Sequence, residues 1–334
     1  MYNDLLMRKF VLIVALFLGV ALVYLSFGEL QTIVQTLRQA NLLFVLLALA
    51  IQGCWFLVVG QMYRSVYHLL GIEDSISHLT LVAAAVTFIN TVTPAAGIGG
   101  LALFASTAGR RGQPTGKVTV AGPLFLLFDQ AAFLIILALG MVVLIRRNNL
   151  GAGEVTAALI LLAIASVIAF FLYLGYRSAE RLGNMLARVA AFINRTSRAV
   201  LHRDYVSEQR AHEFACEIGE GLSGLTEKPS ALLRPVMFGL LSKTLLMGVL
   251  VCSFLAFEVP FSAGTIVGGF SIGYLFLIVS PTPSGIGVVE GVMSLALASL
   301  RVVWSQAVII TLVYRAITFW VPLGIGALAF RRLH

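Results

Sequence analysis

Six continuous apolar stretches constrain the fold of this chain more than any other feature. They occupy residues 10–28, 41–60, 118–145, 155–176, 231–256 and 303–329. Each is close to the ~20 apolar residues that a helix needs to cross a bilayer. With 59% hydrophobic and only 11% charged residues, the chain cannot bury that much apolar surface in one soluble core. The sequence therefore predicts an all-α integral membrane protein with six full transmembrane helices.

Two further apolar stretches, 76–110 and 262–300, are interrupted at their middle by proline and glycine. The first interruption covers residues 93–100 and the second covers 281–287. Proline removes a backbone donor and glycine permits a tight turn, so each stretch is predicted to fold as a broken, re-entrant helical hairpin. Such irregular backbone is tolerated at membrane depth only inside protein or beside a water-filled cavity.

The distribution of lysine and arginine predicts the orientation. With a cytoplasmic amino terminus and both hairpins returning to their own side, sixteen of the 23 basic residues face the cytoplasm, four face outward and three lie within spans. The positive-inside rule therefore places both termini in the cytoplasm. The expected location is the cell (plasma or inner) membrane. The two hairpins then enter from opposite faces.

The interrupted stretches also indicate an inverted repeat. Their Gly-Ile-Gly motifs lie 188 residues apart, and Gln130 and Arg315 in the helices that follow lie 185 apart. Inverted repeats of this kind are typical of secondary transporters; chance recurrence of a short Gly/Pro pattern is the alternative. The predicted units are a first helix with its linker (1–40), repeat 1 (41–146), a connecting helix (147–176), a cytoplasmic amphipathic segment (177–228) and repeat 2 (229–334).

The amphipathic segment begins with a basic part, residues 177–203, that holds six arginines and one acid. We expect it to lie on the cytoplasmic surface and to contact anionic lipid headgroups. A connector that only packs against the membrane domain is the alternative.

Ionisable side chains within spans are candidates for function because they are costly there. Asp129, Lys243, Glu290 and Arg315 have this property. The half-helix that follows each Gly-Ile-Gly should also direct unpaired N–H groups toward mid-membrane, where they attract phosphate. The predicted substrate-binding residues are Asn90, Thr93, Pro94, Gly97, Gly99, Asp129, Lys243, Thr282, Pro283, Ser284, Gly285, Gly287, Glu290 and Arg315.

Two simpler interpretations of these residues stay open. The two acids and two bases balance, so they are also expected to pair with one another. The neutral side chains at the breaks are typical of residues that satisfy nearby backbone groups. We predict no catalytic residue, no metal site and no cofactor, because no zinc ligand spacing or nucleotide-binding motif occurs in a suitable context. Nucleic acid is not an expected partner.

Several motifs together resemble the lysylphosphatidylglycerol synthase transmembrane-region family, also called uncharacterised protein family 0104. They are Thr93-Pro94 through Gly99, Asp129, the segment from Pro281 to Gly291, Tyr314-Arg315 and Trp320. The similarity extends from about residue 10 to 330. It implies lipid handling like that of the flippase half of the bacterial multiple peptide resistance factor. The soluble synthase half has no counterpart here, so the resemblance argues against synthase chemistry. Gln130 stands where the family pattern has a basic residue, which leaves the headgroup open.

The sequence thus favours a flippase that moves a phospholipid, aminoacylated phosphatidylglycerol among the candidates, or a lipid-linked intermediate. The alternatives are a small-solute secondary transporter and a non-catalytic membrane partner of a lipid-modifying or glycan-assembly enzyme. The partners expected are the phospholipid substrate and anionic headgroups, and an oligomer is compatible with all three hypotheses.

Overall fold

The computed structural model describes residues 40–92, 103–104, 107, 115–146, 232–280 and 282–333, with isolated positions between 155 and 173. This part of the chain is helical and contains no strand. Its elements are α2 (Leu42–Leu69), α3 (Ile76–Val92), α5 (Thr115–Arg146), α9 (Leu233–Ala256), α10 (Ala263–Val279), η3 (Pro283–Gly285), α11 (Val288–Ser299), α12 (Trp304–Arg315), η4 (Ala316–Trp320) and α13 (Val321–Leu333).

Four helices of the described part are long and apolar enough to cross a membrane: Leu42–Leu69, Val120–Arg146, Leu233–Ala256 and Trp304–Leu333. They correspond to four of the six predicted spans. The predicted span 10–28 lies outside the described residues, and 155–176 is described only at isolated positions. The last long helix is continuous from α12 through the π-helical η4 to α13. The chain is a multi-pass α-helical membrane protein.

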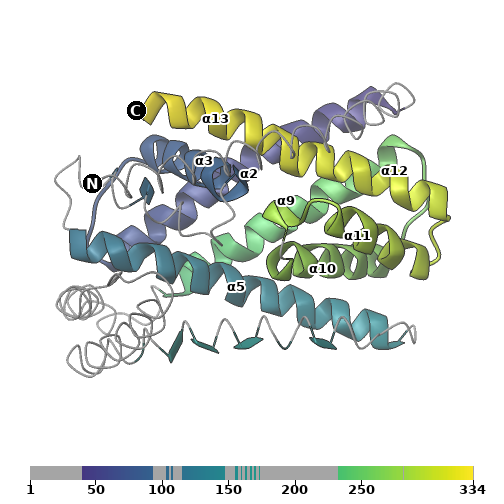
Figure 1. The fold of residues 1–334 in the computed structure, drawn as a ribbon, viewed down its shortest axis with the longest axis horizontal. Helices are drawn as coiled ribbons and strands as arrows, with labels where there is room; N and C mark the ends of the chain where they lie inside the picture. The colour runs from purple at the N-terminus through teal and green to yellow at the C-terminus, as the bar shows by residue number, and fades with distance from the viewer. Residues whose placement is uncertain are drawn as a thin grey trace, which may run out of the picture.

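Helices α2 and α9 form an antiparallel pair along the length of the bundle (Figure 1). The backbone N–H of Asn41, just before α2, donates to the carbonyl of Ala256, the last residue of α9, at 2.8 Å. The Asn41 side chain also accepts from the N–H of Leu43 at 3.1 Å and caps α2. The start of α2 therefore lies beside the end of α9, and the two helices run in opposite directions.

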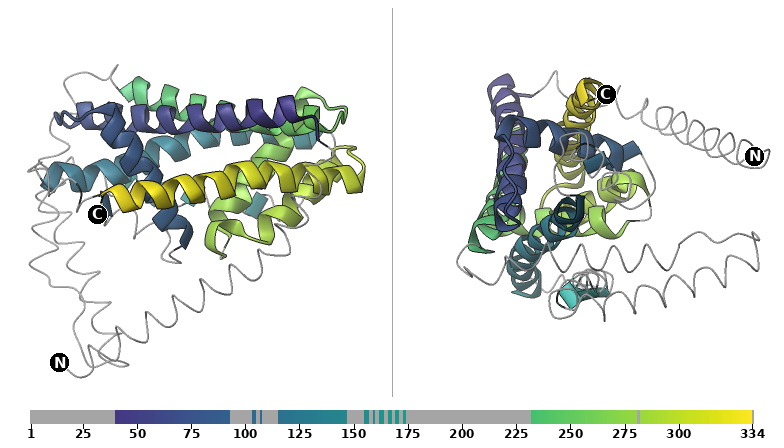
Figure 2. Two further views of the ribbon diagram at one scale, coloured as in Figure 1. Left: turned by 90° about the horizontal axis from the view of Figure 1, so that it is seen from above. Right: turned by 90° about the vertical axis from the view of Figure 1, so that its left-hand side faces the viewer.

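Helices α3 and α10 consequently begin at opposite ends of the bundle. A short connection joins α2 to α3, and another joins α9 to α10. The packing is reciprocal as well. Helix α3 packs against α13, the last helix of the second half, while α10 packs against α5, the last described helix of the first half (Figures 1 and 2). Each short helix is thus held by a long helix from the other half of the chain.

The second predicted interruption is a break between two short helices. Helix α10 begins at its cap Ser262, whose hydroxyl accepts from the N–H of Thr265 at 3.1 Å, and it ends at Val279. Ser284, Gly285 and Gly287 then adopt positive φ angles of 49°, 70° and 78°, a region that glycine enters without penalty. Helix α11 follows and packs back against α10. The first interruption, 93–100, lies outside the described residues.

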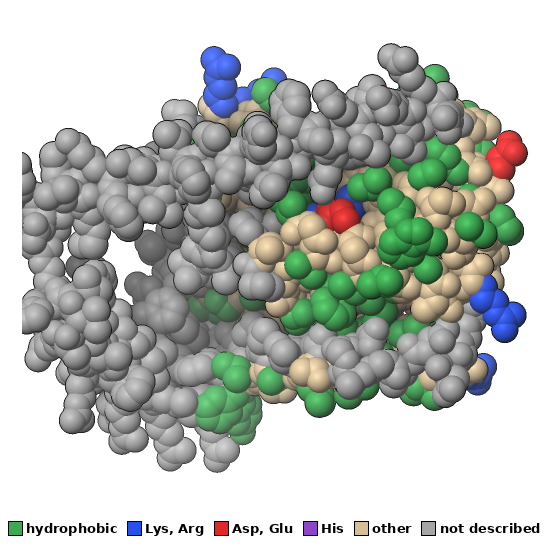
Figure 3. All heavy atoms as spheres, turned by 45° about the vertical axis from the view of Figure 1, so that its right-hand side comes forward, with side chains coloured by type: hydrophobic (Ala, Val, Ile, Leu, Met, Phe, Trp, Pro, Cys, Tyr) green, Lys and Arg blue, Asp and Glu red, His purple; other side chains and the backbone are tan. Residues whose placement is uncertain are grey.

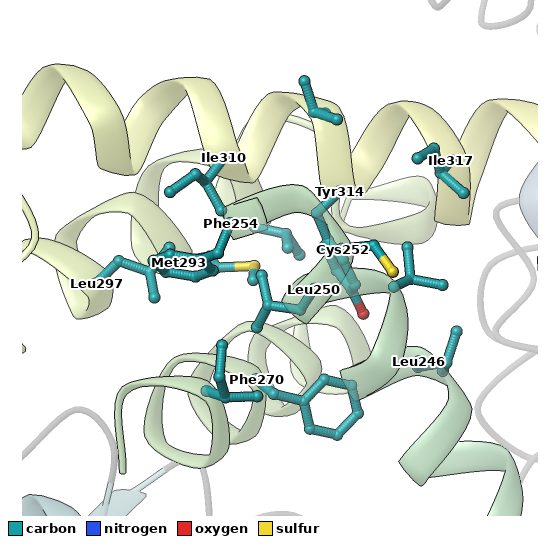
Figure 4. Packing of buried hydrophobic residues seen from close by; sticks show 14 of the residues in the cluster. Leu246, Leu250, Cys252, Phe254, Phe270, Met293, Leu297, Ile310, Tyr314 and Ile317 are labelled. Carbon is teal, nitrogen blue, oxygen red and sulfur yellow. The ribbon is translucent and has the colours of Figure 1, made fainter. Parts of the chain in front are cut away.

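Apolar side chains both fill the bundle and cover its outside. One cluster joins α9, α10, α11 and α12 through side chains such as Leu250, Phe270, Met293 and Ile310, all nearly inaccessible (Figure 4). On the outside, large apolar side chains such as Leu328 are more than half exposed. Lipid is the solvent that makes such exposure favourable.

Candidate functional site

A cavity of about 520 Å³ lies between the two halves of the chain. The ends of α3 and α10 both contribute to its wall, and so do the second break and the middle of the last long helix. The lining residues are Gln52, Trp55, Thr87, Asn90, Thr91, Leu246, Gly273, Tyr274, Leu277, Ile278, Ser280, Thr282, Ser284, Val289, Tyr314, Arg315, Thr318, Phe319 and Pro322. Two short helices that start from opposite ends of the bundle therefore meet around one chamber.

Arg315 is the charged residue among the described residues of this lining, and its guanidinium has a fixed orientation. Its Nε donates to Oε1 of Glu290 at 2.6 Å, and its Nη2 donates to the carbonyl of Ser284 at 2.9 Å. The group also lies 4.9 Å from the ring centre of Phe319, within cation–π range. Arginine presents several donors in a planar fork, so it can hold a carboxylate and a carbonyl at once. Arg315 thereby ties the last long helix to the second break.

Glu290 lies in the first turn of α11, where a carboxylate complements the positive end of the helix. Its side chain is 14% exposed, and Oε2 has no hydrogen-bond partner among the described residues. Helix α11 starts directly after Gly287, without a side-chain cap. The half-helix amino terminus predicted at this break is present, and Glu290 and Arg315 are both next to it.

Lys243 and Asp129 form a second buried pair, which lies behind the cavity wall. The Lys243 ammonium donates to Oδ1 of Asp129 and to the hydroxyl of Tyr274, both at 2.6 Å. The Lys243 side chain is 2% exposed. Tyr274 lines the cavity, whereas Lys243 and Asp129 do not. The pair links α9 to α5 and orients Tyr274 from behind.

The structure thus brings some predicted site residues together and separates others. Asn90, Thr282, Ser284 and Arg315 line the cavity, and Pro283, Gly285 and Gly287 belong to the adjoining break. Glu290 is not in the described cavity lining, but its carboxylate accepts a hydrogen bond from Arg315, which is. The expected mutual pairing of acids and bases is present in both pairs. Thr93, Pro94, Gly97 and Gly99 lie outside the described residues.

Several lining residues were not predicted from the sequence. Gln52 is 0% exposed, and neither atom of its amide has a partner in the described part of the chain. The indole Nε1 of Trp55 likewise has no partner there. A polar amide inside an apolar span was a usable signal for Gln52. Thr87 and Thr91 were missed too, although together with the predicted Asn90 they have the i, i+3, i+4 spacing of one helix face, which was a signal for a polar stripe on α3.

The surface view shows charge at the base of a recess. In Figure 3, acidic and basic side chains lie together in a hollow, and the described groups that border it are hydrophobic or neutral. Among the residues that the structure describes, no group of three or more metal-ligating side chains is found. What the arrangement offers a ligand is a fixed guanidinium, several unpartnered neutral donors and acceptors, and apolar walls.

Comparison with known proteins gives a family for this membrane domain. The sequence profile described as "Lysylphosphatidylglycerol synthase TM region" matches residues 11–326, which is nearly the whole chain. No curated protein matches the sequence. The profile match includes both long antiparallel helices, the second break and the Arg315 site. The chain therefore belongs to the lysylphosphatidylglycerol synthase TM region family.

Proposed function

We propose that the chain is a lipid transporter that moves a phospholipid or a lipid-linked intermediate between the leaflets of the cell membrane. The observation that carries this proposal is the mixed lining of the central cavity. Arg315 supplies a positive charge, Gln52 and Thr282 supply neutral polar groups, and Leu277 and Phe319 supply apolar surface. An amphiphile with a phosphate needs all three kinds of contact.

The size of the cavity fits a headgroup and not a whole lipid. Its volume of about 520 Å³ is in the range of pockets for drug-sized ligands, roughly 300–1,000 Å³. The headgroup and glycerol would enter this space, while both acyl chains would stay among the surrounding lipids. Burying only the polar part is what a flippase requires, because the hydrocarbon core opposes the headgroup and favours the chains.

The reciprocal packing supports alternating access. Helices α3 and α10 approach from opposite ends, and each packs on a long helix of the other half. In transporters built from inverted repeats, one such unit rocks against the other around a fixed midplane site. We propose that the two broken segments are re-entrant hairpins, that both termini are cytoplasmic, and that the cavity opens to one leaflet at a time.

Family membership supports a role with lipids and leaves the headgroup open. Aminoacylated phosphatidylglycerol is one candidate, and Gln130 is the position at which this chain departs from the pattern expected for that lipid. Gln130 is buried, and its Oε1 has no partner among the described residues. For this chain we propose transport and not synthesis. A small-solute transporter and a non-catalytic partner of a lipid-modifying enzyme are the competing functions.

Reconstitution separates these functions. Purified protein is placed in vesicles that contain fluorescent, headgroup-labelled phosphatidylglycerol, and a membrane-impermeant quencher reports the label in each leaflet. The proposal predicts faster exchange between leaflets than in protein-free vesicles. Parallel vesicles loaded with a water-soluble anion of similar headgroup chemistry should retain it. Leakage of the anion without lipid exchange would favour a solute transporter, and neither activity would favour the non-catalytic partner.

A further inference from the structure

A second hollow, separate from the central cavity, lies between the end of α2 and the start of α9 and has a volume of about 690 Å³. Its polar lining consists of Gln61, Arg64, Ser65, His68 and Arg234. None of the described residues that line it is acidic. We refer to this hollow as the basic groove. Its lining offers a net positive charge from two guanidinium groups.

The arginines of the basic groove have no acidic partner among the residues that the structure describes. Neither Arg64 nor Arg234 forms an ion pair with a described residue, and the buried Nε of Arg64 has no hydrogen-bond partner there. Lys243 and Arg315, the basic residues that are buried in the described bundle, each have a carboxylate partner, whereas Arg64 is partly buried and Arg234 is exposed. A buried guanidinium nitrogen without an acceptor is costly, and a bound anion would remove that cost.

The groove lies near the end of α2, close to where a helix of this length would leave the hydrocarbon core of a bilayer. Helix α2 has 28 residues, so it is about 42 Å long at 1.5 Å per residue and exceeds a hydrocarbon core of about 30 Å. Arg64 and His68 lie in its last two turns. Arg234 lies in the first turn of α9, whose positively polarised amino terminus is at the same end.

Apolar side chains border the same groove. Leu233 and Met237 are 62% and 56% exposed, and Phe238 completes this side of the lining. Arg234, Met237 and Phe238 share one face of α9 by their i, i+3, i+4 spacing. A ligand in this place therefore meets cationic donors at one end and apolar surface next to them. That combination fits an amphiphile better than a soluble anion.

We propose that the basic groove binds the phosphate of an anionic glycerophospholipid from the adjacent leaflet, with the acyl chains along Leu233 and Met237. Arg64 and Arg234 hold the phosphate oxygens, and Gln61 and His68 contribute further hydrogen bonds. This site differs from the central cavity in its residues and does not depend on transport. Basic pockets between transmembrane helices are known places of anionic-lipid binding.

Photolabelling tests the site directly. The full chain in nanodiscs receives a trace of phosphatidylglycerol with a photoreactive group near the glycerol, and mass spectrometry locates the adducts. Wild-type adducts should concentrate on residues 61–69 and 233–238. The double variant Arg64→Gln/Arg234→Gln should lose about tenfold or more of this labelling, since each removed charge weakens lipid attraction several-fold. Arg64→Lys/Arg234→Lys retains the charge and should retain most of the labelling.

The matched control is Arg331→Gln/Arg332→Gln, which removes the same charge from the end of α13. It should leave labelling of the groove unchanged. Equal losses in both glutamine double variants, or no loss in the groove variant, would overturn the proposal. Equal labelling by a zwitterionic phosphatidylcholine probe would also overturn it. If excess soluble glycerol phosphate abolished the labelling, the groove would be a site for a soluble anion and the lipid assignment would be wrong.

Discussion

Arg315 donates from Nε to Oε1 of Glu290 at 2.6 Å across the helices α12 and α11, while Oε2 of the same carboxylate stays without a partner in the described bundle. The pair is nearly buried, with side-chain exposures of 6% and 14%. It lies at the second break, and Arg315 faces the central cavity. The pair thus connects Arg315, which supplies the positive charge in the cavity lining, to the start of α11 directly after the second break.

Removing one member of this pair should destabilise the protein. Arg315→Gln leaves the Glu290 carboxylate buried without its cation, which costs about 3–5 kcal/mol for a buried pair. Arg315→Lys should recover only part of this loss, because an ammonium does not reproduce the planar fork toward Glu290 and the Ser284 carbonyl. Denaturant unfolding in detergent measures the difference. Equal stability of the lysine variant and the wild type would contradict the fork geometry.

The pair Asp129 and Lys243 should behave differently, because neither side chain lines the cavity. Asp129→Asn and Lys243→Met should each cost about 3–5 kcal/mol by leaving an unpaired buried charge. The double variant removes both charges and should recover most of the stability. Its lipid exchange in vesicles should stay within about threefold of wild type, as expected for a site that does not contact substrate. Loss of exchange in the stable double variant would show that this pair takes part in transport.

Gln52 should lower the stability of the fold while supporting lipid exchange. A buried amide without partners costs about 1–3 kcal/mol, so Gln52→Leu should unfold at a higher denaturant concentration than wild type. The same variant should exchange lipid more slowly, because the cavity loses a donor and an acceptor. Cys54→Ala, at an exposed position of the same helix, is the control and should change neither quantity. A Gln52→Leu protein that is less stable but fully active would refute this role.

Two glycines of α13 test the packing of α3 against it. A Cβ at Gly326 would lie 2.5 Å from the backbone carbonyl of Ala84 and 2.7 Å from Cβ of Phe88, so α3 would have to move. Gly326→Ala should therefore destabilise the protein by about 1–3 kcal/mol. A Cβ at Gly324 would meet nothing within 4 Å, and Gly324→Ala should be neutral or stabilising by up to about 1 kcal/mol. Similar effects of the two variants would contradict the close approach of α3 and α13.

The sequence predicted the helix limits well where local chemistry determines them. Helix α10 was expected at 262–280 and spans Ala263–Val279, because Ser262 caps it and the Pro/Gly segment ends it. Helix α3 was expected over 75–92 and is helical from Ile76 to Val92, the last residue described before the first interruption. Helix α2 extends about nine residues past the predicted span, since Gln61 and Arg64 interrupt the apolar run without interrupting the helix.

The composition of the site was only partly predictable, for a physical reason. Burial cost identified Arg315 and Lys243 as unusual, but only the tertiary packing determines that Arg315 faces the cavity while Lys243 points to Asp129. Gln52 and Tyr274 also line the cavity, but no charged residue lies near either of them in the sequence to mark the position. The π-helical turn at Ala316–Trp320, directly after Arg315, has no sequence signal that we can identify.

The measurement that tests the central claim most directly is leaflet exchange of labelled phosphatidylglycerol by the charge-neutral double variant Glu290→Gln/Arg315→Gln. This variant removes both charges together, so it should fold and stay close to wild type in stability. We predict that its exchange rate falls by about tenfold or more, because the cavity loses its charged hydrogen-bond donor. A folded double variant that exchanges lipid at the wild-type rate would contradict a headgroup site at Arg315 and the transport function built on it.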